Sequence, residues 1–131
     1  MQIFRQPSEM QAAARAWKQA GRRIGFVPTM GYLHDGHRSL IEQARTRADV
    51  VVVSIFVNPI QFGPNEDLSR YPRDFARDEA VCRAAGADAV LYPEPASMYA
   101  ADHSVYVEET RLGGGLCGAA RPGHFDGVAT V

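Results

Sequence analysis

With 131 residues, 46% of them apolar and 22% charged, the sequence has the length and composition of one ordinary globular domain or part of one. A net charge of −1 gives no basic surface for nucleic acid or an anionic membrane. No apolar run approaches the roughly 20 residues of a membrane span, and the N-terminus lacks a signal peptide's apolar core. We therefore expect a cytoplasmic protein that binds neither nucleic acid nor membranes.

Cysteine and lysine are both scarce. Cys82 and Cys117 lie in a predicted helix and a glycine-rich loop, without metal-site spacing, and we expect two unpaired thiols. Among fourteen basic residues only Lys18 is a lysine, and it falls in the first predicted helix, where a solvated side chain is expected. The sequence therefore offers no obvious phosphate-binding lysine.

The first quarter of the chain predicts strand, helix, strand. Residues 2–4 are typical of a short edge strand. Ser8 followed by Gln11 matches a capping box, which predicts Ser8 as the N-cap of a helix that Gly21 ends. Residues 24–27 are the second strand candidate. One face of the helix is apolar and consists of Met10, Ala13, Ala14 and Trp17.

The next segment predicts a βαβ unit. A helix should follow the turn at residues 27–37 and continue to about Ala48. Residues 50–57 form a continuous, largely β-branched apolar run, which is typical of a strand covered on both faces. Such strands belong to parallel sheets flanked by helices, with right-handed crossovers. The pattern therefore predicts an α/β fold.

Beyond this strand the elements are shorter. Residues 58–65 carry two prolines and a glycine, which indicates a loop without regular structure. Pro72 suits the first turn of a helix that runs to Ala85 and is stopped by Gly86. Residues 87–93 follow as another strand.

The last thirty residues have a weaker pattern. Residues 104–108 alternate and predict an outer strand, whereas residues 112–118 are too rich in glycine to be regular. Asp126 is placed to cap a helix begun by Val128. Because the sequence stops in the first turn of that helix, we expect a truncated chain.

The most informative motif is the turn that contains His34 and His37. Two histidines three residues apart at a helix N-terminus can face one bound group, and helix-terminal N–H groups favour phosphate. Gly31 and Gly36 permit close backbone approach to a ligand. The alternatives are two surface histidines or a zinc site, for which His103 and His124 lie in distant loops.

Further polar residues follow the buried strand or lie near the C-terminus. Asn58 and Gln61 suit a small polyhydroxy acid, although they can equally be turn residues that bond local backbone. Arg121 and His124 could meet a carboxylate. The carboxylates of residues 66–78 predict a solvated helix face. The glycines at 113–115 and 118 match no phosphate-loop pattern, and a flexible loop is expected there.

Four stretches together resemble one family, pantothenate synthetase (pantoate–β-alanine ligase): residues 27–39, 52–63, 71–74 and 121–128. The resemblance extends over nearly the whole chain and implies its N-terminal portion. It implies a Rossmann-like, nucleotidyltransferase-like domain spanning residues 1–131, with a C-terminal domain absent. It also implies a homodimer that uses ATP and Mg²⁺ to join pantoate to β-alanine through a pantoyl-adenylate.

The resemblance also implies the site residues. His37, the residue assigned the acid role, and His34 would contact the phosphates of ATP. The pantoate and β-alanine site would contain Gln61, with Asn58 and Tyr71 nearby, and would include Arg121 and His124. The whole ATP-binding stretch would be Met30, Gly31, Tyr32, Leu33, His34, Asp35, Gly36 and His37.

Two other functions stay open at this point. A related adenylyl- or cytidylyltransferase would leave the nucleotide in its product, and a nucleotide-binding or self-associating module would catalyse nothing. The family's phosphate-binding lysine would come after residue 131, so we expect the isolated chain to be inactive or nearly so.

Overall fold

The computed structural model describes residues 1–64 and 66–131, in two compact units. One, here called the sheet unit, comprises residues 1–57 and 72–98. The other, here called the loop unit, comprises residues 58–71 and 99–131. Within the described residues, no helix combines the length and the apolar character needed to cross a bilayer.

The sheet unit is built on four parallel strands: β1 (Gln2–Phe4), β2 (Ile24–Thr29), β3 (Val50–Ile55) and β4 (Ala89–Leu91). Their order is β1-β4-β3-β2, so β1 is an edge strand as predicted. All six residues of β3 are buried, because the strand lies between two neighbours and is covered on both faces. The parallel sheet of the α/β prediction is confirmed.

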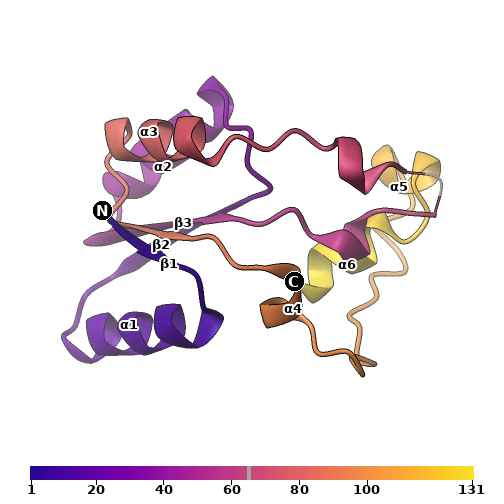
Figure 1. The fold of residues 1–131 in the computed structure, drawn as a ribbon, viewed down its shortest axis with the longest axis horizontal. Helices are drawn as coiled ribbons and strands as arrows, with labels where there is room; N and C mark the ends of the chain where they lie inside the picture. The colour runs from indigo at the N-terminus through magenta and orange to yellow at the C-terminus, as the bar shows by residue number, and fades with distance from the viewer. Residues whose placement is uncertain (65) are drawn as a thin grey trace. The chain divides into compact units, whose positions relative to one another are not determined.

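Helices cover both faces of this sheet (Figure 1). The helices α2 (Asp35–Arg45) and α3 (Phe75–Ala84) pack on one face through a core that includes Ile41 and Cys82. The helix α1 (Pro7–Gln19) covers the other. The apolar face predicted for α1 is confirmed, since Met10, Ala13, Ala14 and Trp17 pack together against the sheet.

The start of α1 corrects one prediction. The helix begins at Pro7 with Gln6 as its N-cap, and no side chain caps it, so Ser8 lies inside the first turn. Proline lacks the N–H that a cap would satisfy, and its fixed φ suits the first helical position, so the helix starts two residues earlier than predicted. The predicted stop is confirmed, because Gly21 adopts a φ of +74° just beyond Ala20, the C-cap.

Two other helix ends differ from the prediction. The helix α2 ends at Arg45 instead of near Ala48. At this end the hydroxyl of Thr46, the C-cap, donates to the Gln43 carbonyl over 2.8 Å. Pro72 lies outside α3, because Asp74 is the N-cap and accepts a hydrogen bond from the Arg77 N–H. A local side-chain cap thus decides the start of α3.

The remaining elements are short. The sheet unit ends in α4 (Pro95–Met98), and the loop unit contains α5 (Cys117–Ala120) and α6 (His124–Thr130). It also contains the 3₁₀ turns η1 (Pro59–Gln61) and η2 (Leu68–Arg70), so the loop predicted at residues 58–65 has a regular turn, with Asn65 outside the described residues.

Several C-terminal predictions are wrong. Residues 104–108 form no strand, and Val105 is 76% exposed, because no neighbouring strand pairs with this segment in the described part of the chain. The predicted irregular stretch ends early, since α5 begins at Cys117. Asp126 caps nothing: α6 begins two residues before it, after Gly123, whose φ of +78° favours glycine.

Candidate functional site

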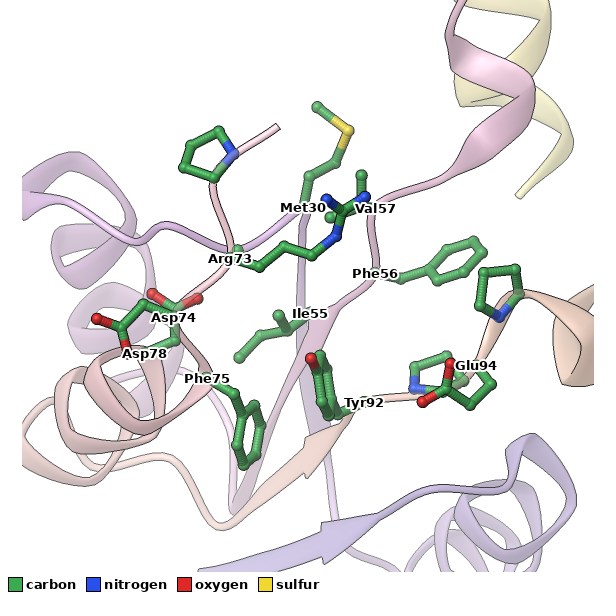
Figure 2. Close-up of a pocket in the computed structure, with 14 residues that line it drawn as sticks. Met30, Ile55, Phe56, Val57, Arg73, Asp74, Phe75, Asp78, Tyr92 and Glu94 are labelled. Atoms are coloured by element: carbon green, nitrogen blue, oxygen red, sulfur yellow. The ribbon is translucent and has the colours of Figure 1, made fainter. Parts of the chain in front are cut away.

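A pocket of about 140 Å³ opens in the sheet unit at the carboxyl ends of β2, β3 and β4 (Figure 2). Ligands of parallel α/β sheets bind at this edge. Phe75 and Tyr92 stack on each other there with ring centroids 4.2 Å apart. Besides these two, the lining consists of Met30, Gly31, residues 55–57, residues 72–74, Asp78 and residues 93–95.

The histidine turn leaves β2 at this edge and starts α2. His34 is the N-cap of the helix, and its Nδ1 accepts a hydrogen bond from the Gly36 N–H over 3.1 Å. In return, His37 Nδ1 accepts from the His34 N–H over 3.3 Å. The two rings lie 4.0 Å apart, so the structure places both imidazoles at one helix N-terminus, as the spacing predicts.

This reciprocal cap fixes the chemistry of both rings. A backbone N–H can only donate, so Nδ1 of each imidazole must carry the lone pair. In a neutral ring the proton is then on Nε2. His34 and His37 therefore each keep one Nε2–H donor for a partner other than the cap, which suits phosphate oxygens.

The charge state of His37 follows from its surroundings. Partial burial lowers its pKa below the ordinary value of 6.5, the neighbouring His34 lowers it further, and the Asp78 carboxylate opposes both. His37 is therefore mainly neutral at pH 7, and it can donate a hydrogen bond without carrying positive charge.

Glycine lets the backbone approach the first imidazole closely. A Cβ on Gly36 would lie 2.9 Å from the Cε1 atom of His34, closer than a real contact allows. Asp35 is exposed in the first turn of α2, where a carboxylate complements the partial positive charge of the helix N-terminus. Tyr32 is 49% exposed, and the Arg77 guanidinium lies 4.8 Å from its ring centroid.

Asp78 is a residue of this site, and the prediction that it lies on a solvated helix face is wrong. It is 1% exposed, and both of its oxygens accept backbone N–H groups from the histidine turn, Tyr32 and Leu33. A signal existed in its spacing, because Asp78 lies four residues before the fully buried Cys82 and so shares the buried face of α3. Burial also raises the pKa of the Cys82 thiol to about 11, which makes it unreactive.

The loop unit gathers the amide side chains. Asn58 is fully buried, and its Nδ2 donates both to Gln61 Oε1 over 2.9 Å and to the Gly127 carbonyl over 3.0 Å. The Tyr99 hydroxyl donates to Asn58 Oδ1 over 2.9 Å. Since Oε1 of Gln61 accepts, Nε2 is the donor end of this amide. Tyr99 is absent from the sequence prediction, and no motif marks it.

The same unit holds Arg121 and His124. Arg121 Nε donates to Glu66 over 2.5 Å, which corrects the prediction of a solvated Glu66, and Arg121 Nη1 lies 3.2 Å from His124 Nε2. His124 Nδ1 lies 2.9 Å from the Gln61 carbonyl, and because a carbonyl can only accept, the proton is on Nδ1. The carboxylate that Arg121 meets in this structure is therefore one of its own chain.

The structure thus brings the predicted residues together in two groups. Met30 to His37 lie in the sheet unit, whereas Asn58, Gln61, Tyr71, Arg121 and His124 lie in the loop unit. Tyr71 packs edge-on against Phe62, with ring centroids 5.8 Å apart. Among the described residues, no group of three or more histidine, cysteine or acidic side chains could hold a metal ion.

Comparisons with known proteins point to one family. The family model of pantoate–β-alanine ligase matches residues 2–131. Pantothenate synthetase 1 of Bradyrhizobium diazoefficiens is 57% identical over all 131 residues, which make up 46% of its length. Pantothenate synthetase of Desulfovibrio desulfuricans is 56% identical, again with the whole chain matched against 46% of the relative.

Solved structures give the same result. A crystal structure of pantothenate synthetase from Thermus thermophilus matches 99% of this chain and 46% of its own, with a TM-score of 0.89 at 47% identity. Pantoate–β-alanine ligase from Francisella tularensis, complexed with β,γ-ATP and β-alanine, matches 97% of this chain and 49% of its own, with a TM-score of 0.86 at 38% identity. The chain spans about half the length of the relatives it matches. It belongs to the pantoate–β-alanine ligase family.

Proposed function

We propose that this chain forms the part of a pantothenate-forming ligase that binds ATP and pantoate. In this proposal residues 1–131 are a nucleotide-binding domain, Met30 to His37 line the ATP site, and His34 and His37 contact its phosphates. Gln61 binds pantoate and then β-alanine, with Asn58, Tyr71, Arg121 and His124 around it. The observation that carries the proposal is the reciprocal cap, which leaves two Nε2–H donors at a helix N-terminus.

The reaction that fits has two steps. A pantoate carboxylate oxygen attacks the α-phosphorus of ATP, the bond from that phosphorus to the bridging oxygen of the β-phosphate breaks, and pyrophosphate leaves. The β-alanine amine then attacks the acyl carbon of the adenylate, and AMP leaves. Negative charge builds on the departing pyrophosphate, and in this proposal the two imidazole N–H groups stabilise it. A neutral His37 does this as a hydrogen-bond donor.

In the loop unit the amide of Gln61 is oriented before any ligand arrives. Its Oε1 accepts from Asn58, so its Nε2 donates, and a carboxylate or hydroxyl oxygen of pantoate is a suitable acceptor. Arg121 and His124 act on the backbone carbonyl of Gln61, and so they hold the loop that carries the amide. This orientation favours a small oxygen-rich acid.

The family resemblance supports two additions, a homodimer and Mg²⁺ bound with ATP. Mg²⁺ keeps several waters and takes its other ligands largely from nucleotide phosphates. The described residues supply no cluster of acidic or imidazole ligands for it, so no residue of this chain is assigned to the metal.

Calorimetric titration of ATP into the 131-residue chain tests the proposal. His34→Ala and His37→Ala should each weaken binding by about tenfold or more, since each removes a donor to a charged oxygen. Lys18→Ala is the control, because Lys18 is exposed on α1. Absence of ATP binding, or equal binding by the histidine variants, would overturn the proposal.

Turnover is tested on a polypeptide that continues past Val131. ATP–pyrophosphate exchange that depends on pantoate supports an acid-adenylating ligase. Exchange that depends on a phosphorylated substrate instead would assign the chain to a nucleotidyltransferase activity, and the proposed ligase function would be wrong.

A further inference from the structure

Asp78 connects α3 to the histidine turn through two short hydrogen bonds. Its Oδ2 accepts from the Tyr32 N–H over 2.8 Å, and its Oδ1 accepts from the Leu33 N–H over 2.7 Å. The side chain is 1% exposed, and Leu33 is fully buried. A carboxylate buried this deeply is costly unless its oxygens are hydrogen-bonded, and here the backbone of the turn supplies the donors.

The turn needs such a partner because of its backbone. Gly31 and Tyr32 are consecutive residues with positive φ, +85° and +51°. Left-handed geometry is unfavourable for a non-glycine residue, so Tyr32 adopts it only where its surroundings compensate. Successive N–H groups in a tight turn form a concave donor surface that binds an anion. In this protein the anion is the protein's own carboxylate.

The contact between turn and carboxylate is also close. A Cβ added to Gly31 would lie 3.0 Å from Asp78 Oδ2 and 3.0 Å from Ile55 Cγ2, so only glycine lets the turn approach this far. Leu33, whose N–H Asp78 binds, directly precedes the N-cap His34. Fixing the Leu33 N–H therefore fixes the point from which both imidazoles project.

We propose that Asp78 is a positioning residue that sets the place and the tautomer of the His34–His37 pair by holding the two preceding N–H groups. This rests on the proposed function only where it concerns ATP. Both hydrogen bonds of Asp78 described above go to the backbone, so its contribution reaches the imidazoles through the backbone and through its charge. The charge acts on His37 in the direction that keeps a proton on the ring, against burial and His34.

Asp78→Asn tests this in the 131-residue chain. Asparagine keeps the shape and one acceptor, but its NH₂ group faces a backbone N–H and cannot bond it. Glu79→Gln is the matched control, because it removes an equal charge from the next residue of α3, which pairs with Arg83 on the outer side of the helix. The readouts are the imidazole tautomers and the His37 pKa by NMR, and the ATP affinity by calorimetry.

The expected results differ between the two variants. In Asp78→Asn the Nε2–H tautomer of both rings should give way to a mixture of tautomers. The pKa of His37 should fall, because the charge that favours its protonation is lost. ATP binding should weaken by about tenfold, since two donors lose their fixed position. Glu79→Gln should leave all three unchanged. A folded Asp78→Asn chain with wild-type tautomers, His37 pKa and ATP affinity would overturn the assignment.

Two further measurements keep the test decisive. If Asp78→Asn does not fold, Asp78→Glu retains the charge and both acceptors but displaces the turn by one methylene, and should lower ATP affinity while keeping the His37 pKa closer to wild type. If neither variant folds, a pH titration of the wild type by NMR replaces them. The amide chemical shifts of Tyr32 and Leu33 should then change together as one carboxyl group titrates, and amide shifts that follow no carboxyl group would overturn the assignment of Asp78. A wild-type chain that fails to bind ATP would count against the proposed function, while the tautomer readout would still judge Asp78.

Discussion

The turn after β2 and the loop after β3 hold their polar side chains in different ways. In the turn, a buried carboxylate accepts two backbone N–H groups, and each of the two histidines that follow accepts one backbone N–H group at the start of the helix. In the loop, a neutral chain runs from the Tyr99 hydroxyl through Asn58 to Gln61. The first arrangement anchors the backbone by charge, and the second orients a side chain without charge.

The difference has a physical consequence for what each region can bind. An ionised carboxylate only accepts, so Asp78 fixes where the N–H groups of the turn lie, and it acts on the tautomers of His34 and His37 only through that position. A chain of hydroxyl and amide groups has a direction, because each donor needs an acceptor, and it therefore dictates that Gln61 presents Nε2. The charged carboxylate of Asp78 therefore determines where the backbone of the turn lies, and the neutral hydrogen bonds of Asn58 determine which end of the Gln61 amide donates.

The largest expected effect comes from breaking the neutral chain at its centre. Asn58→Leu leaves the Gln61 Oε1, the Gly127 carbonyl and the Tyr99 hydroxyl without the partner each has now. The loss of these three hydrogen bonds, at about 0.5–1.5 kcal/mol each, should lower the free energy of unfolding by about 1.5–4.5 kcal/mol. Urea unfolding of the wild type and the variant measures it, and an unchanged midpoint would mean that these hydrogen bonds do not stabilise the loop unit.

Gly31→Ala tests the charged anchor. Alanine must adopt a φ of +85° and place its Cβ 3.0 Å from both Asp78 Oδ2 and Ile55 Cγ2, and we expect destabilisation of about 1–3 kcal/mol. Gly21→Ala is the matched control, because Gly21 has a similar φ of +74° but nothing within 4 Å of the added Cβ. The difference between the two unfolding free energies isolates the close approach of the turn to Asp78. Equal losses would show that backbone strain alone is responsible.

Tyr99→Phe is a milder change to the neutral chain. The hydrogen bond to Asn58 Oδ1 is lost and the ring can keep its packing against His103, so the free energy of unfolding should fall by about 0.5–1.5 kcal/mol. The same substitution should also loosen the orientation of Gln61. NMR of the side-chain amide reports this, because the Gln61 NH₂ resonances should sharpen or shift toward those of a glutamine whose side chain is not held by hydrogen bonds. Unchanged resonances would show that Asn58 needs no help from Tyr99.

Local pattern predicted much of this molecule. The β-branched run of β3 and the helix start at the histidine turn follow from spacing, because both report which face of one element is buried. The hydrogen-bond partners of Asp78 and Tyr99 could not be found in that way. These partners lie 45 and 41 residues away, and Glu66 meets Arg121 across 55 residues. Periodicity shows that a residue is buried, but it does not show which distant polar group satisfies it.

The smallest expected effect concerns the imidazole pair and pH. Because burial and His34 hold the pKa of His37 below 6.5, the unfolded chain binds more protons than the folded one between the lowered value and 6.5. The contribution of His37 to the free energy of unfolding should therefore be complete above pH 6.5 and should decrease as the pH falls from 6.5 through the lowered pKa. Protonation also places an N–H on Nδ1, facing the His34 N–H that it now accepts, so the cap opens. Urea midpoints at pH 7.5 and 5.5 measure the decline, and His37→Asn, which keeps an acceptor but does not titrate, should reduce it. An equal decrease in the His37→Asn variant would show that other groups cause the pH dependence and that the imidazole cap does not contribute to it.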